Sequence, residues 1–211
     1  MTPTNTRRQF LAASLGLIAA PALAAVPARP LSGLLADPGQ IDPALRARAL
    51  AALARHRGRL ADARIIAIAD FSRRSADARF HLLDTETGRV ESVLVAHGRG
   101  SDPAHMGWLQ RFSNAPGSNA SCHGAFLTSN EYHGKHGRSQ RLIGLDATNS
   151  NALDRAIVIH SAPYVSAGMA RQMGKVGRSQ GCFTLTAEDL GPVMARLGQG
   201  RLIYADKVGA A

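Results

Sequence analysis

The run Gly177-Arg178-Ser179-Gln180-Gly181-Cys182-Phe183 contains the most informative residue of this sequence, Cys182. It lies 22 residues after His160, which closes the apolar stretch 156–159. Glycines at 177 and 181 permit a tight turn, and a histidine at the end of a predicted strand can remove the proton of a nearby thiol. A cysteine thiol with a pKa of about 8.5 needs such a base at neutral pH. The pattern therefore predicts a cysteine nucleophile, Cys182, with His160 as its base.

The same turn predicts an oxyanion hole, because the Gly181 and Cys182 amides can approach a bound carbonyl. Such a site catalyses acyl transfer. Two alternatives stay open from the residues alone: Cys182 is an inert buried thiol beside a core histidine, or it forms a disulfide with Cys122. Cys122 itself is not predicted to be the nucleophile, because adjacent residues on a strand point to opposite faces and His123 follows it directly.

A longer stretch of the sequence supports the prediction of a cysteine nucleophile. The run 158–163 (Val-Ile-His-Ser-Ala-Pro), followed by Ser-Gln-Gly-Cys at 179–182, resembles the signature of the L,D-transpeptidase (YkuD-type) catalytic domain, in the branch with a Gly-Arg-Ser-x-Gly-Cys turn. The similarity extends upstream through 97–100, 112–114 and 134–139 and covers roughly residues 65–204. The resemblance implies a mostly β, single compact catalytic domain with an N-terminal helix and one or two short peripheral helices.

The resemblance also implies roles for individual residues. Cys182 would be the nucleophile, His160 the base, Ser161 a residue that orients the imidazole, and Ser179 a residue that shapes the loop. Ser179, Gln180, Arg178 and His97 would contact substrate, although a structural role for Arg178 is equally open, and Trp108 is a further candidate for the pocket lining. The sequence departs from the common form at Gln180, where many members carry His, and at Phe183 and Thr184, so substrate preference is less well defined than the nucleophile.

The implied reaction begins with attack of the thiolate on the third residue of a peptidoglycan stem tetrapeptide, with release of the terminal D-alanine. The thioester is then resolved by an acceptor, which the sequence leaves open between a stem peptide, water, a D-amino acid and a protein. No cofactor or metal is expected. The resemblance further implies acylation by carbapenems.

The N-terminus has the pattern of an export signal. Arg7 and Arg8 precede an apolar run at 11–20 and the small residues Ala22-Leu23-Ala24, which predicts a twin-arginine signal peptide over 1–25 and a Pro- and Gly-rich linker over 26–40. The apolar run is too short to span a membrane, so no stable membrane insertion is expected after cleavage. The catalytic domain is then expected over 41–211, in the periplasm or cell wall.

The positive net charge of the chain indicates which class of partner it binds. The chain carries 25 basic and 15 acidic residues, a net charge of +10, and loses two arginines with the signal. Such a protein is drawn to anionic polymers. Its basic residues lack the interleaved aromatics that stack on bases, so an anionic cell-wall surface is a better partner than nucleic acid.

Two other functions compete with the acyltransferase. Six histidines lie at 97, 105, 123, 133, 136 and 160, which keeps a zinc-dependent wall peptidase open, although the pair at 133 and 136 falls in a predicted glycine-rich loop and not on a helix. A non-catalytic wall-binding module with an inert Cys182 is the third class. Metal content and thiol reactivity separate the three.

Secondary structure is predicted from periodicity. Asp42 and Pro43 begin a helix that should end near Arg57, with Leu45, Ala49, Leu50 and Leu53 on its apolar face. A second helix is expected within 186–197, where Thr186 and Asp189 have capping-box spacing. Pro192 favours a later start, with Asp189 as the cap. Seven short runs indicate strands: 64–71, 78–84, 90–96, 124–128, 141–145, 155–160 and 201–205.

Overall fold

The computed structural model describes Met1 and residues 41–209. Within these residues eight strands form one mixed sheet in the order β3-β2-β1-β8-β4-β5-β6-β7. The strands are β1 (Ile65–Asp70), β2 (Ala78–Asp84), β3 (Val90–Leu94), β4 (Gly124–Gly134), β5 (Gly137–Gly144), β6 (Val158–Ser161), β7 (Phe183–Leu185) and β8 (Leu202–Asp206). The helices are α1 (Pro43–His56), α2 (Ala167–Met173) and α3 (Ala187–Leu197). The β-rich fold with an N-terminal helix is confirmed.

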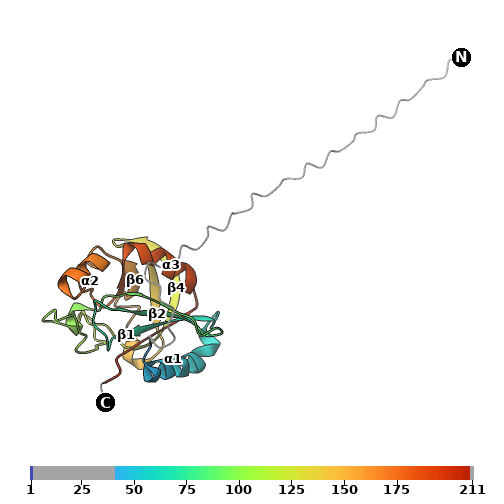
Figure 1. The fold of residues 1–211 in the computed structure, drawn as a ribbon. Helices are drawn as coiled ribbons and strands as arrows, with labels where there is room; N and C mark the ends of the chain where they lie inside the picture. Colours follow the sequence, from blue (N-terminus) through green and yellow to red (C-terminus); the bar gives the residue numbers. More distant parts are fainter. Residues whose placement is uncertain (2–40, 210–211) are drawn as a thin grey trace.

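Helices α1 and α3 cover opposite faces of the sheet (Figure 1). Strand β1 shows why, because successive side chains of a strand point to opposite faces. Ala67 and Ala69 pack in the cluster that contains the apolar residues of α3, while Ile66 and Ile68 pack in the cluster that contains those of α1. The two buried faces together hold the sheet that carries the site.

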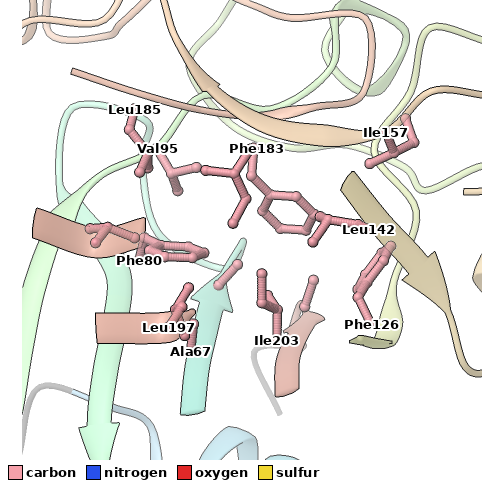
Figure 2. Packing of buried hydrophobic residues seen from close by; sticks show 14 of the residues in the cluster. Ala67, Phe80, Val95, Phe126, Leu142, Ile157, Phe183, Leu185, Leu197 and Ile203 are labelled. Carbon is pink, nitrogen blue, oxygen red and sulfur yellow. The ribbon is translucent and has the colours of Figure 1, made fainter. Parts of the chain in front are cut away.

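Phe183 anchors the segment that follows Cys182 in the core (Figure 2). Its ring centroid lies 5.3 Å from that of Phe126, 6.1 Å from Phe80 and 6.2 Å from Phe71. Burial of an aromatic side chain of this size stabilises the fold by roughly 1.5–3 kcal/mol. The residue next to the predicted nucleophile is therefore fixed by packing.

The segment after β3 links the two edge strands of the sheet. The Ala96 amide donates to the Thr184 carbonyl on β7 at 2.9 Å, and the Ser179 amide donates to the His97 carbonyl at 2.9 Å. Strands β3 and β7 stand at opposite ends of the strand order, so these bonds curl the sheet until its edges meet beside Cys182.

Several boundaries differ from the sequence prediction. On α1, Leu50 is 38% exposed and Ala52 is buried in its place beside Leu45 and Ala49. Helix α3 begins at Ala187, because Thr186 Oγ1 accepts a hydrogen bond from the Asp189 amide at 3.0 Å, so the predicted cap at Asp189 is wrong. Pro192 lies inside this helix.

The β-strands show a second set of differences. Residues 133–136, predicted as a loop, belong to a long β4–β5 hairpin whose pairing continues to Gly134 and Gly137. Strand β7 was not predicted, and β6 begins at Val158 and not at Arg155. The predicted signal peptide and linker lie outside the described residues. No helix in the described part of the chain is long and apolar enough to cross a membrane.

Candidate active site

The turn at Ser179–Cys182 is held by one side chain. Ser179 Oγ donates to the Cys182 carbonyl at 2.8 Å and accepts from the Gly181 amide at 3.0 Å. Gly181 has φ +114°, a left-handed conformation that disfavours any side chain. Because the Gly181 N–H is used inside the turn, the expectation that it faces a bound carbonyl is wrong for this conformation. Gly181 contributes its backbone geometry instead.

His160 lies near the end of β6 with both ring nitrogens in contact with polar groups. Its Nδ1 is 3.0 Å from the Ser161 carbonyl, and its Nε2 is 3.1 Å from Thr184 Oγ1. A carbonyl oxygen only accepts, so Nδ1 carries the proton and Nε2 is left as the basic nitrogen. Ser161 thus orients the imidazole through its backbone carbonyl.

Cys182 and His160 line the same cavity, which has a volume of about 750 Å³. The sulfur of Cys182 contacts the Ala156 carbonyl at 3.6 Å, and Ala156 has φ +53°. Catalytic hydrogen bonds often tighten only when substrate is bound, so a shared cavity is the relevant geometry at this stage. Ser179, Gln180 and Arg178 also line the cavity, and the structure therefore brings together most of the predicted site residues.

Burial shifts the pKa values of the Cys182 thiol and the His160 imidazole so that each group favours its neutral form. It raises the pKa of the Cys182 thiol, against the Val158 amide and the charges of Arg155 and Lys135, which lower it. Burial also lowers the pKa of His160; the bond to the Ser161 carbonyl raises it, while nearby His136 and Lys135 lower it. The resting site therefore favours a neutral thiol beside a neutral imidazole.

Arg178 has a structural task at the cavity edge. Its guanidinium donates to the backbone carbonyls of Asp102 and Pro103, the latter at 2.9 Å. It thereby ties the turn at 179–182 to the 102–103 segment while its charge remains beside the cavity. Gln180 is exposed on the cavity lining, as expected of a substrate contact.

His97 does not line the cavity, so its assignment to substrate binding is corrected. Its side chain is 1% exposed and lies between the Arg79 guanidinium, 2.8 Å from Nδ1, and Asp102 Oδ2, 3.3 Å from Nε2. Burial, with the positive charge of Arg79, lowers the pKa of His97 to about 3, despite Asp102. Trp108 is also absent from the lining.

Four residues with titratable side chains line the cavity but were not predicted as site residues from the sequence: Lys135, His136, Arg155 and Tyr164. Arg155 donates to the Ser113 carbonyl at 2.7 Å and to the Ala120 carbonyl at 2.5 Å. Lys135 and His136 form the turn of the β4–β5 hairpin, and the motif 134–139 was the signal that pointed to them. Nothing in the sequence pointed to Arg155, because its task depends on long-range carbonyl contacts.

The alternatives concerning cysteine can now be compared with the geometry. Cys122 and Cys182 are both free thiols, so the predicted alternative of a disulfide between them is not present. Cys122 is buried in the hydrophobic core, and burial raises its pKa. His123 packs against Phe112 with ring centroids 4.9 Å apart. Among the described residues, no three His, Cys, Asp or Glu side chains gather as metal ligands would.

Comparison with known proteins gives the family. The L,D-transpeptidase catalytic domain matches residues 38–205, and no curated protein matches the chain. Among solved structures, L,D-transpeptidase 3 from Mycobacterium tuberculosis has 13% identity and a TM-score of 0.43 over 68% of this chain and 61% of that one. An L,D-transpeptidase from Mycobacterium smegmatis has 12% identity and a TM-score of 0.42, over 68% of this chain and 58% of that one.

A mutant of the helical cell shape determining protein Pgp2 from Campylobacter jejuni has 11% identity and a TM-score of 0.48, over 81% of this chain and 58% of that one. The chain spans about three fifths of the length of the first solved structures that it matches. The domain match covers well over half of the sequence. The chain therefore belongs to the L,D-transpeptidase catalytic domain family.

Proposed function

We propose that the protein is a peptidoglycan L,D-transpeptidase in which Cys182 is the nucleophile and His160 the base. The Cys182 sulfur attacks the carbonyl of the third residue of a stem tetrapeptide. Its proton passes to His160 Nε2 and then to the leaving amine of the terminal D-alanine, which departs as the thioester forms. An acceptor amine then attacks the thioester, gives a proton to His160 and releases the thiol.

One observation carries this proposal: Cys182 and His160 face one cavity, and the Ser161 carbonyl accepts from the Nδ1 N–H. The basic nitrogen is therefore Nε2, which accepts from Thr184 Oγ1 in this structure and can take up a proton. The hydrogen bond to Ser161 serves the purpose that a carboxylate serves in many triads, since it fixes the tautomer and the ring orientation. The Cys182 amide is the backbone donor that remains for the oxyanion, because the Gly181 amide is bonded to Ser179.

The charge of the cavity lining supports an acidic donor. Arg99, Lys135, Arg155 and Arg178 line it, against one carboxylate, Asp154. A concave surface with this excess of positive charge attracts anions and concentrates them near the nucleophile. A stem peptide with free carboxylates fits such a site, and the basic surface of the whole chain fits an anionic cell wall.

We also propose that the protein works in the periplasm or cell wall after export by the twin-arginine route. The support is the pair Arg7 and Arg8 before the apolar run at 11–20. Replacement of both arginines by Lys should leave the precursor in the cytoplasm, as measured by cell fractionation. A normal periplasmic yield of this variant would show that the arginine pair is not needed.

The central experiment measures acylation and turnover together. The protein is incubated with a carbapenem, and intact-mass spectrometry should show one adduct, located to the peptide that contains Cys182. With disaccharide-tetrapeptides, cross-linked dimers indicate transpeptidation and tripeptides indicate hydrolysis. His160→Ala should slow acylation by roughly 100- to 10,000-fold, the range expected for loss of a general base.

Two serine variants provide the matched control. Cys182→Ser should abolish both the adduct and turnover, whereas Cys122→Ser should retain most of both, because Cys122 lies in the core and not on the cavity. Equal loss in the two variants would contradict the assignment of the nucleophile. Turnover that disappears in chelator without any adduct would favour a zinc peptidase, and neither adduct nor turnover would favour a binding module.

A further inference from the structure

The ring of His136 covers the ring of His160. Their centroids lie 4.4 Å apart with an interplanar angle of 24°, a stacked pair. His160 is 2% exposed, while His136 is an exposed turn residue, and both line the cavity that contains Cys182. The outer ring therefore lies between part of the buried imidazole and solvent.

The β4–β5 hairpin presents His136 in a defined place. Pairing of Gly134 with Gly137 leaves Lys135 and His136 as the two residues of the turn. Next to it, Glu131 and Arg138 form a two-point ion pair, with N–O distances of 2.8 and 3.1 Å. Planar pairs of this kind fix geometry better than single contacts. The stacked ring of His136 therefore extends from a turn whose flanking strands are paired and joined by an ion pair.

The groups around His160 come from five parts of the fold. The hairpin turn contributes Lys135 and His136, β5 contributes Ser139 directly opposite His160, and β7 contributes Thr184. Beyond Thr184 stands Tyr164, whose hydroxyl is 3.3 Å from Thr184 Oγ1, and the thiol of Cys182 faces the same cavity. Among these groups His136 is the one whose ring stacks on the ring of His160.

We propose that His136 is a positioning residue for the base His160, holding its ring by stacking and making proton uptake by His160 depend on the charge of His136. This rests on the proposed function, in which the Cys182 S–H bond breaks and an N–H bond forms at His160 Nε2. A neutral aromatic ring stacked on the resulting imidazolium attracts it, whereas a protonated His136 repels it. Nearby His136 and Lys135 both lower the pKa of His160, which agrees with this electrostatic coupling.

The test compares three variants by the rate of Cys182 alkylation with iodoacetamide from about pH 5 to about pH 9, a range that brackets histidine titration. His136→Ala removes the stack, and His136→Phe keeps an aromatic face without a titratable charge. His133→Ala is the matched control, since His133 is an exposed histidine of the same hairpin and is not part of the cavity lining.

At neutral pH, His136→Ala should react about two- to fivefold more slowly than the wild type, the factor expected for loss of an exposed cation–aromatic contact. His136→Phe should retain the neutral rate, because it keeps the aromatic face, but its rate should fall less steeply toward low pH than that of the wild type, because phenylalanine cannot carry a charge. His133→Ala should follow the wild type throughout.

The proposal is overturned if both His136 variants follow the wild-type profile, or if both lose rate equally with no change in pH dependence, as simple packing would give. Failure of the proposed function looks different: there His160→Ala leaves alkylation of Cys182 unchanged. Slow alkylation in His160→Ala together with wild-type behaviour of the His136 variants would reject the role of His136 alone.

Discussion

Arg155 shows how one residue connects the backbone to the chemistry of the site. Its two carbonyl contacts, to Ser113 and Ala120, hold the loop that packs against the turn at 179–182. Its positive charge also lowers the pKa of the Cys182 thiol, against the larger effect of burial. The same side chain therefore has a structural and an electrostatic task.

Replacement of Arg155 by Gln should move the alkylation profile of Cys182 to higher pH. Without the nearby cation the pKa of the thiol rises further, so less thiolate is present at neutral pH and the rate there should fall severalfold. Iodoacetamide kinetics as a function of pH measure this. Arg171→Gln, which removes an exposed cation of α2 that is not part of the cavity lining, serves as the control and should leave the midpoint in place. An unchanged midpoint in Arg155→Gln would show that its charge does not reach the thiol.

The turn at residues 179–182 depends on the backbone conformation of one glycine, Gly181. A Cβ at Gly181 would lie 2.6 Å from the Ala120 carbonyl oxygen and 2.8 Å from Ile157 Cδ1, and the residue has φ +114°. Both features oppose any side chain at this position.

Gly181→Ala should therefore lower the free energy of unfolding by about 1–3 kcal/mol and strongly reduce acylation of Cys182. Gly58→Ala is the comparison, because nothing lies within 4 Å of a Cβ there, and it should be neutral or slightly stabilising. Thermal unfolding and carbapenem acylation measure the two effects. A Gly181→Ala variant as stable and as reactive as Gly58→Ala would contradict the role of the positive φ.

For helices, strands and turns, the sequence predicts features that depend on neighbouring residues and misses those that depend on contacts between distant segments. The glycine-rich turn at 179–182, the histidine near the end of β6 and most strands were predictable, because glycine placement and short β-branched runs are local signals. Strand β7 was missed since it has three residues and its partner in β6 is distant in sequence. The burial of His97 and the reach of His136 over His160 depend on contacts between strands, which no single-sequence pattern contains.

The whole molecule places the site where the edges of its sheet come together. Bonds between the segment after β3 and the segment 179–184 join the two ends of the strand order. On one side of this junction Phe183 packs in the hydrophobic core. On the other side buried His97 contacts both Arg79 and Asp102. Distortion of the junction should thus affect stability and the geometry of Cys182 together.

The buried histidines connect this architecture to the pH dependence of folding. His81 on β2 is fully buried, and its Nδ1 lies 2.7 Å from Ser92 Oγ. Burial, with the charge of Arg73 as a smaller cause, lowers the pKa of His81 to about 4. An unfolded histidine titrates near about 6.5, so below that pH the unfolded chain takes up this proton before the folded protein does.

The contribution of His81 to stability is therefore fully present above about pH 6.5 and is lost as the pH falls toward about 4, by roughly 1–3 kcal/mol. Urea unfolding at pH 7 and at pH 4.5 should show this loss in the wild type. His81→Leu should show a smaller difference between the two pH values, whatever its absolute stability, whereas His133→Ala should keep the wild-type difference because that histidine is exposed. If His81→Leu loses as much stability on acidification as the wild type, the acid sensitivity comes from other groups, of which the buried His97 is the next to replace.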